Sequence, residues 1–265
     1  MNNNKNITII PELSIIVPTY NERENIKILI SRIRKALDKY NASYEIIIVD
    51  DDSPDGTGQL AEQLAKQYGN IKVIHRPTKM GLATATLNGI KHAKGDIIAV
   101  MDADLQHPPE LLPKLHQAIL KGNDIAIASR YIEGGKIEGW SLKRKIVSKG
   151  AITLAHIFLP QTRKIKDIMS GYFALRKELI KNTKLNPTGY KILLEIVAKT
   201  KPAKVVEIPY TFKPRIKGKS KLSTKEMLNY VKHLVRLYIE SKEWLRLLKF
   251  CVVSLSGVIL SEFLL

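Results

Sequence analysis

The chain has 265 residues, of which 45% are hydrophobic, as expected for one large packed domain or one domain with an appendage. Its formal net charge of +18 is unusual and indicates an anionic partner: a nucleic acid, a phosphorylated substrate or an acidic membrane surface. The single cysteine, Cys251, excludes an intramolecular disulfide and fits a reducing compartment.

The first half of the chain alternates short apolar runs with helical patterns. Strands are expected at 13–17, 45–49, 71–74, 96–101 and 124–128. Helices are expected at about 24–39, around 60–68, from 81 onward and at 110–120. This alternation predicts an α/β fold, with a mostly parallel sheet and helices on both faces.

Polar segments follow four of these strands at the point where each strand ends. They are Pro18–Glu22, Asp50–Asp55, Asp102–Gln106 and Ser129–Tyr131. In a parallel sheet the carboxyl ends of the strands meet along one edge, where such folds bind ligands. The four segments are therefore expected to form one site.

The acidic pair Asp102 and Asp104, together with Gln106, indicates a metal site. All three side chains carry hard oxygen ligands, which suit Mg²⁺ or Mn²⁺ bridging to phosphate oxygens. The alternative is that the two acids merely start a turn, and the adjacent His107 is interpreted as a turn histidine rather than a ligand.

Two further groups of charged residues are candidates for substrate contacts. Asp51 and Asp52 can receive a ribose or a base, although acids here also cap the helix at Thr57, where Asp55 is well placed. Basic residues that can clamp phosphates are Arg130, Arg144, Arg215, Lys217, Lys219 and Lys221. Each alone is explained as well by a solvated surface charge.

The second half is less regular and ends in an apolar segment. A basic helix is expected at about 142–158, a strand at 168–175, a helix at 190–196, a strand at 205–212 and a basic loop at 213–221. Ser223 and Glu226 form a capping box that starts an amphipathic helix, which lies either on a membrane surface or on the domain itself. The apolar run from 250 is shorter than the roughly 20 residues of a full span, so it predicts a partial transmembrane helix or, alternatively, a buried terminal helix. The expected division is a catalytic domain at 1–222, an interfacial helix at 223–248 and the start of a transmembrane segment at 249–265.

Other common active-site patterns do not account for the chain. No Gly-x-Gly-x-x-Gly follows the first strand, and there is no Walker A sequence. Ser53 and Ser129 have no evident His/Asp relay, so nucleophilic hydrolysis is unsupported.

Several motifs together resemble the family-2 inverting glycosyltransferases of the GT-A fold and, within them, the dolichyl-phosphate mannose synthases. The strongest are Pro-Thr-Tyr-Asn-Glu at 18–22, Asp-Asp-x-Ser-Pro-Asp-Gly at 50–56 and Asp-Ala-Asp-Leu-Gln-His-Pro-Pro at 102–109. Further matches are Ser-Arg-Tyr at 129–131, Arg-Lys at 144–145, the segment 167–177, Gly-Tyr-Lys at 189–191 and the loop 215–222. The departures are small: Asp52 and Ala128 stand where the family pattern has glycine.

The resemblance implies a role for each matching residue. The nucleotide would be surrounded by Pro18, Tyr20, Glu22, Val49 and Asp51. The divalent ion would be held against the diphosphate by Asp102, Asp104 and Gln106, with Ala103 beside the donor. Substrate phosphates would be contacted by Arg130, Arg215 and Lys221, and the acceptor phosphate by Arg144 and Ser148. Asp102, Asp104, Arg130 and Arg144 would be the catalytic residues.

The activity implied by the resemblance is mannose transfer from GDP-mannose to a dolichyl (polyprenyl) phosphate at the cytoplasmic face of a membrane. A lipid phosphate is already an anionic nucleophile at neutral pH because its second pKa is about 6, so a strong general base is unnecessary. The expected reaction is a single in-line displacement with inversion at the anomeric carbon. A glucosyltransferase using UDP-glucose is the first alternative, since no residue pattern identifies the base or the sugar. A nucleic-acid-binding module is the second, disfavoured because only 6% of residues are aromatic and the basic residues do not interleave with them.

Overall fold

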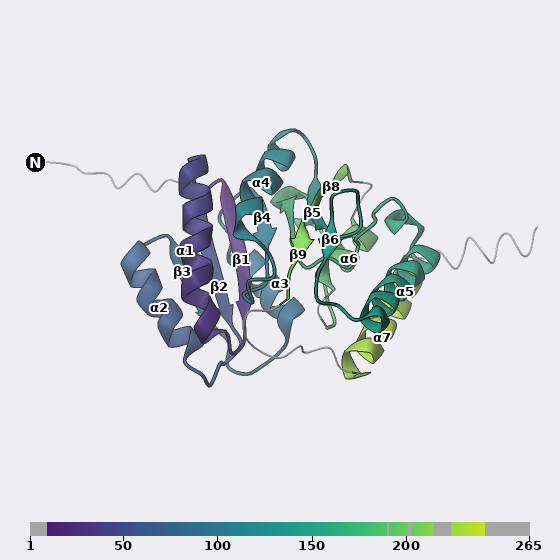
Figure 1. The fold of residues 1–265 in the computed structure, drawn as a ribbon, viewed down its shortest axis with the longest axis horizontal. Helices are drawn as coiled ribbons and strands as arrows, with labels where there is room; N and C mark the ends of the chain where they lie inside the picture. Colours follow the sequence, from purple (N-terminus) through teal and green to yellow (C-terminus); the bar gives the residue numbers. More distant parts are fainter. Residues whose placement is uncertain (1–9, 190, 201–202, 215–223, 242–265) are drawn as a thin grey trace, which may run out of the picture.

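A seven-stranded sheet forms the centre of the protein. The computed structural model describes residues 10–189, 191–200, 203–214 and 224–241. The strand order is β3-β2-β1-β4-β7-β5-β8, and helices lie on both sides of the sheet (Figure 1). The strands are β1 (Leu13–Thr19), β2 (Tyr44–Asp50), β3 (Ile71–His75), β4 (Ile97–Val100), β5 (Ile125–Ser129), β7 (Phe173–Arg176) and β8 (Val205–Pro209). The predicted α/β architecture is confirmed.

The helices cover both faces of the sheet, and alternate residues of each central strand pack against the helices of one face or the other. They are α1 (Arg23–Tyr40), α2 (Thr57–Tyr68), α3 (Leu82–His92), α4 (Leu112–Leu120), α5 (Leu142–Phe158), α6 (Ile192–Lys199) and α7 (Thr224–Glu240). In β1, Leu13, Ile15 and Val17 join the core cluster formed with α1, α2 and α4. Ile16 points the other way, into the cluster formed with α3, α5, α6 and α7. Both faces of the strand are therefore buried, which explains its continuous apolar sequence.

Strand direction fixes where the four polar segments meet. β1 pairs in parallel with β2 and β4, and β2 with β3. β7 lies between β4 and β5 and is antiparallel to both, so β4 and β5 run the same way. The ends of β1, β2, β4 and β5 consequently lie on one edge, as the sequence predicted.

Two predicted strands are shorter than expected, for identifiable reasons. The strand predicted at 168–175 begins only at Phe173 and runs to Arg176, because Ser170 forms a turn in which its hydroxyl accepts from the Tyr172 N–H at 3.2 Å and donates to the Ala128 carbonyl at 2.8 Å. The predicted strand 205–212 breaks at Tyr210, whose N–H bonds the Ser129 carbonyl and whose carbonyl accepts from Lys136. There the chain leaves the main sheet as β9 (Thr211–Phe212), which pairs with β6 (Lys136–Ile137).

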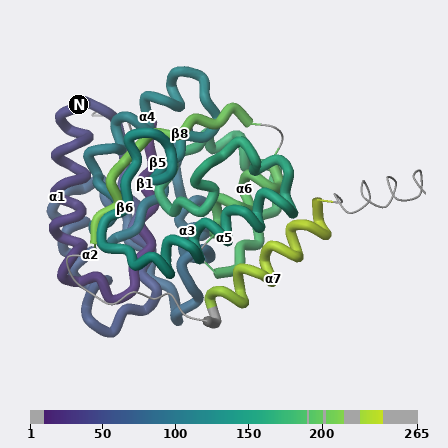
Figure 2. The backbone as a smooth tube through the Cα atoms, turned by 45° about the vertical axis from the view of Figure 1, so that its right-hand side comes forward, coloured from purple at the N-terminus to yellow at the C-terminus, as the bar shows by residue number. Residues whose placement is uncertain are grey.

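The helices α5 and α7 lie side by side at one end of the molecule (Figure 2). The Tyr230 hydroxyl on α7 donates to the Ala151 carbonyl on α5 at 2.6 Å, and the rings of Phe158 and Tyr238 meet edge-on with centroids 5.4 Å apart. Within the described ranges, no helix is both long and apolar enough to span a bilayer. The predicted transmembrane segment 249–265 lies outside them, as do Ser223 of the capping box and 242–248.

Candidate active site

The ends of β1 and β2 are fixed to each other by Asp50. Its carboxylate accepts hydrogen bonds from the Thr19 hydroxyl at 3.0 Å, the Ser53 hydroxyl at 2.6 Å and the Ser53 N–H at 3.1 Å. Pro18 and Val49 are paired across the two strands and buried. Asp55 lies one residue before Gly56, the N-cap of α2, and its carboxylate accepts from the Thr57 N–H at 3.0 Å without being the expected cap residue. Asp50 thus holds the end of β1 and the segment after β2 in place at the edge of the sheet.

Asp51 is buried at this edge and binds the start of α3. Its carboxylate accepts from the N–H groups of Met80 and Gly81 at 3.1 and 2.8 Å and pairs with the Arg76 guanidinium at 2.8 Å. Both members of the ion pair are buried, with side-chain exposures of 4% for Arg76 and 5% for Asp51. The sequence argument missed Arg76, although it follows β3 directly and the same strand-end rule selects it.

The neighbouring segment carries the other residues predicted to surround a nucleotide. The Lys79 ammonium lies 3.8 Å from the centroid of the Tyr20 ring. The Glu22 carboxylate accepts from the Asn25 side chain at 2.7 Å, at the start of α1. Asp52, which replaces the family glycine, has φ +58°, in the left-handed region that glycine occupies at lower cost. The structure brings Tyr20, Glu22 and Asp51 to the same edge, as predicted.

The acidic turn after β4 has a strained backbone. Leu105 adopts φ +63°, which is uncommon for a bulky residue and is typical of functional turns. Asp104 is buried and accepts from the Gln106 N–H at 3.1 Å. The Gln106 side-chain N–H donates to the Lys213 carbonyl at 2.7 Å. Ala103 is buried between the acids, whereas the Asp102 side chain is 32% exposed.

His107 supports the turn through a backbone contact and a ring contact. Its Nδ1 accepts from the Asp102 N–H at 3.0 Å, and its ring stacks on Tyr172 with centroids 5.0 Å apart. Burial lowers the pKa of His107 to about 4, so the ring is neutral at physiological pH. These contacts fit the interpretation of His107 as a turn histidine, which stays a prediction.

Arg130 at the end of β5 forms a buried fork with Asp167. Its Nε and Nη2 donate to the two carboxylate oxygens at 2.8 and 2.7 Å, and its backbone N–H donates at 2.9 Å. Asp167 is fully buried. Burial works against the charge of Arg130, but the hydrogen bond to Asp167 outweighs it and raises the pKa of the guanidinium. The sequence argument placed Arg130 at the site without identifying this partner.

The start of α5 faces the same region. The Arg144 guanidinium lies over the Trp140 ring, 4.2 Å from its centroid. The Ser148 hydroxyl accepts from the Tyr131 hydroxyl at 2.9 Å. Tyr131 follows Arg130 directly, so α5 and the end of β5 bring Arg130, Arg144 and Ser148 together.

Lys191, just before α6, also reaches the site, although the sequence argument gave it no role. Its ammonium donates to the Met169 carbonyl at 3.0 Å. Burial and the nearby Arg130 lower its pKa to about 8. Arg215, Lys217, Lys219 and Lys221 lie outside the described residues, and their predicted phosphate contacts remain predictions.

Comparison with known proteins identifies the family. The family model described as glycosyl transferase family 2 matches residues 14–183. The chain belongs to glycosyltransferase family 2. It is 52% identical over 251 residues to a dolichol-phosphate mannosyltransferase of Pyrococcus furiosus, a match that spans 95% of this chain and 70% of that protein. It is 38% identical over 238 residues to a dolichol-phosphate mannosyltransferase of Saccharomyces cerevisiae, spanning 86% of this chain and 87% of that protein. The predicted family membership is confirmed, and the protein is a glycosyltransferase.

Solved structures confirm the GT-A fold of this glycosyltransferase. Glucosyl-3-phosphoglycerate synthase of Mycobacterium tuberculosis, in complex with Mn²⁺, UDP and glucosyl-3-phosphoglycerate, superposes with a TM-score of 0.64 at 19% identity. The superposition covers 87% of this chain and 80% of that one. A structure of the same enzyme with Mg²⁺ and UDP gives a TM-score of 0.63. At this identity the likeness concerns the fold.

Proposed function

We propose that this glycosyltransferase transfers mannose from GDP-mannose to dolichyl (polyprenyl) phosphate with inversion, in a reaction that depends on a divalent metal ion. The observation that carries the proposal is the 52% identity to a dolichol-phosphate mannosyltransferase across 95% of the chain. The positions of Asp102 and Arg130 at one sheet edge, with Arg144 of α5 sharing the Trp140 ring with Arg130, support it, because donor and acceptor phosphates both need charged partners.

The residues of the acidic turn fit a divalent ion. Within the described residues, no three His, Cys, Asp or Glu side chains cluster closely enough to hold a metal by themselves. That agrees with Mg²⁺ or Mn²⁺, which take one or two carboxylates and complete their shell with substrate phosphates and water. The ion would be held by Asp102, Asp104 and Gln106. The Gln106 side-chain N–H donates to the Lys213 carbonyl, so the side-chain carbonyl oxygen of Gln106 points away from Lys213. A bound ion would supply charge stabilisation for the departing diphosphate.

The acceptor side requires no protein base. His107, the histidine adjacent to the acids, is buried, neutral and bound to the Asp102 backbone. An acceptor phosphate is ionised at neutral pH, so its oxygen can attack the anomeric carbon directly. The chain's contribution is to orient that phosphate with Arg144 and Ser148 and to place Arg130 beside it, through positioning and electrostatic stabilisation.

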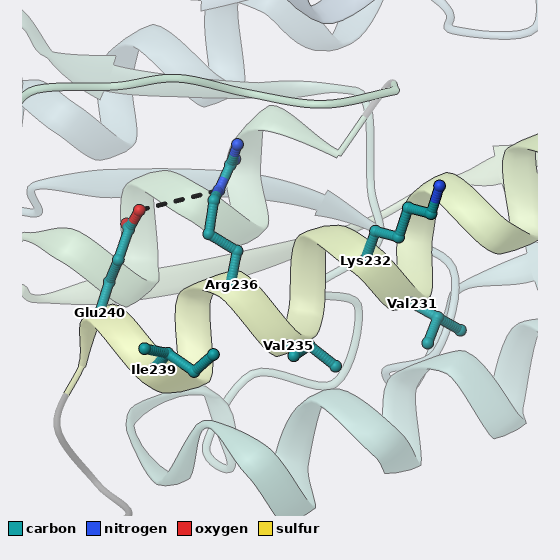
Figure 3. A pocket seen from close by; sticks show the side chains of 6 residues that line it. All are labelled: Val231, Lys232, Val235, Arg236, Ile239 and Glu240. Carbon is teal, nitrogen blue, oxygen red and sulfur yellow. Dashed lines mark ion pairs between the residues drawn. The ribbon is translucent and has the colours of Figure 1, made fainter.

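Two exposed apolar stripes support the predicted attachment to a membrane surface. On α7, Met227, Leu228, Val231, Val235 and Ile239 are 47–58% exposed. On α5, Leu142, Ile146, Leu154 and Ile157 are 39–74% exposed. A shallow groove on α7 is lined by six residues: Val231, Val235 and Ile239 point to one side, and Lys232, Arg236 and Glu240 point to the other (Figure 3). We propose that these helices rest on the cytoplasmic leaflet, where each Lys or Arg near the surface adds about 1 kcal/mol.

A transfer assay tests the proposed donor and metal. Purified protein is incubated with a short polyprenyl phosphate and labelled GDP-mannose or UDP-glucose, each with Mn²⁺ and with EDTA. Mannosyl lipid from GDP-mannose alone, lost with EDTA, is expected. Glucosyl lipid would replace the donor while keeping the reaction class, and undiminished transfer in EDTA would contradict the metal requirement.

A further inference from the structure

Lys191 is held at the active site by contacts on both sides of it. It stands immediately before the first residue of α6, and its ammonium donates to the Met169 carbonyl at 3.0 Å. Met169 belongs to the turn whose Asp167 binds Arg130 and whose Ser170 binds the end of β5. The ammonium group is therefore anchored to the backbone that also supports Arg130.

The charges around Lys191 belong to the substrate site. Arg130, Asp167, Asp102 and Arg144 all act electrostatically on its ammonium group. The first two form a mutual fork. Asp102 is a proposed metal ligand and Arg144 a proposed acceptor contact, so Lys191 lies within electrostatic reach of both halves of the reaction.

We propose that the Lys191 ammonium contacts the acceptor phosphate during sugar transfer, as a further catalytic residue. This inference rests on the proposed function, in which a lipid phosphate must approach a donor that already carries a diphosphate. The two anions repel each other, and a compact cation between them reduces that repulsion in the transition state. A lysine suits this position because its ammonium is a point charge with three N–H donors.

A polar cluster centred on Glu195 fixes the residues that precede Lys191. Glu195 is fully buried and accepts from the Asn186 N–H at 2.7 Å. Arg236 on α7 donates to the Asn186 carbonyl and, at 3.3 Å, to the Thr188 hydroxyl. In Figure 3 this side chain points away from the apolar side of α7. Arg236 thus connects the surface helix to residues 186–188.

The start of α3 contacts the segment before Lys191 from the side opposite to α7. The Gly189 carbonyl accepts from the Ala83 N–H at 3.2 Å, at the start of α3. That helix start is the one bound by Asp51. Residues 186–189 are therefore fixed between α7 and the proposed nucleotide side, which limits the positions available to Lys191.

The test compares Lys191→Met, which keeps the length and removes the charge, with Lys191→Arg, which restores the charge. Lys181→Met is the matched control, because Lys181 is exposed and pairs only locally with Glu178 at 3.4 Å. The measurements are kcat and KM for a short polyprenyl phosphate, the Kd of GDP with Mn²⁺ by calorimetry, and the melting curve of each variant. Lys191→Gln provides the same comparison if Lys191→Met does not fold.

Lys191→Met is expected to lower kcat/KM for the acceptor by about 10²-fold or more, with partial recovery in Lys191→Arg and an unchanged Kd for GDP. Lys181→Met is expected to match the wild type. Acceptor kinetics of Lys191→Met equal to those of an active wild type would overturn the inference alone. A loss of GDP affinity equal to the loss of kcat/KM would also overturn it, by moving Lys191 to the donor. A wild type that makes no lipid-linked sugar would overturn the proposed function itself.

Discussion

Replacing Glu195 should reveal how strongly α7 is attached to the catalytic domain. The fully buried carboxylate accepts from Asn186 and Lys199 at 2.7 Å and lies 3.3 Å from His233 on α7. Lys199 also pairs with Glu240 on α7 at 2.8 Å. The cluster therefore connects α6, α7 and the segment before Lys191 through one side chain.

The expected change in the free energy of unfolding depends on which partners of Glu195 each substitution leaves buried without a contact. Breaking a buried ion pair costs about 3–5 kcal/mol when the partner charge is stranded. Lys199 retains Glu240, so Glu195→Leu should lower the free energy of unfolding by about 3 kcal/mol, the lower end of that range. Glu195→Gln keeps an oxygen for the Asn186 N–H and should cost about 1–2 kcal/mol.

The stability difference between the wild type and Glu195→Gln should depend on pH. Burial raises the pKa of Glu195, but the nearby His233 imidazole, the Lys199 ammonium and the Asn186 N–H outweigh it and lower the pKa from 4.5 to about 2. A depressed carboxyl pKa stabilises the fold above the unfolded value and loses that contribution as pH falls through the folded one. The stability difference between wild type and Glu195→Gln should therefore be constant above pH 4.5 and shrink toward pH 2.

Urea titrations followed by circular dichroism, repeated at several pH values, measure both effects. Glu195→Asp is a useful intermediate, because it keeps the charge and shortens its reach. A Glu195→Leu variant within 0.5 kcal/mol of the wild type, about the size of an ordinary surface substitution, would refute the reasoning. A difference that grows as the pH falls would refute the sign of the pKa shift.

Four further substitutions test the packing and the site. Gly89→Ala should lower the free energy of unfolding by about 1–3 kcal/mol, because a Cβ there meets the Cγ2 atom of Ile16. Gly150→Ala on α5 should raise the free energy of unfolding by about 0.5–1 kcal/mol, because a Cβ added there meets no other group within 4 Å. Equal urea midpoints for the two glycine variants would contradict this contrast. Asp104→Ala should remove the Mn²⁺ dependence of GDP binding in calorimetry, and an unchanged titration would exclude Asp104 from the ion site. Tyr131→Phe removes the 2.9 Å hydrogen bond to Ser148 and should raise the KM for the acceptor about 3–10-fold, whereas an equal rise in the donor KM would argue against an acceptor role.

The order of the elements and the location of the site followed from local patterns. Apolar runs such as Ile97–Val100 predicted buried strands correctly. Both faces of the sheet are covered by helices, so every residue of such a strand is apolar. The rule that strand ends share an edge places Tyr20, Asp51 and Asp102 together from the sequence alone, and it also selects Arg76. These features depend on neighbouring residues, which the sequence displays directly.

Features that depend on distant pairs could not be predicted in the same way. The run Phe173–Arg176 has the composition of any buried strand, and nothing in it indicates that β7 lies antiparallel between β4 and β5. Asp167 binds Arg130 from 37 residues away, and the turn around Ser170 creates that approach. Lys191 binds the Met169 carbonyl from 22 residues away, and Glu195 binds the segment before it.

The anomeric configuration of the lipid-linked product tests the central claim most directly. Incubating the wild type with GDP-α-mannose and a polyprenyl phosphate is expected to yield a mannosyl phosphate lipid of β configuration, because the lipid phosphate displaces GDP in one step. Nuclear magnetic resonance of the purified product, through the one-bond carbon–proton coupling at the anomeric centre, distinguishes the two anomers. An α-linked product, or mannose released without attachment to the lipid, would contradict direct attack by the acceptor phosphate.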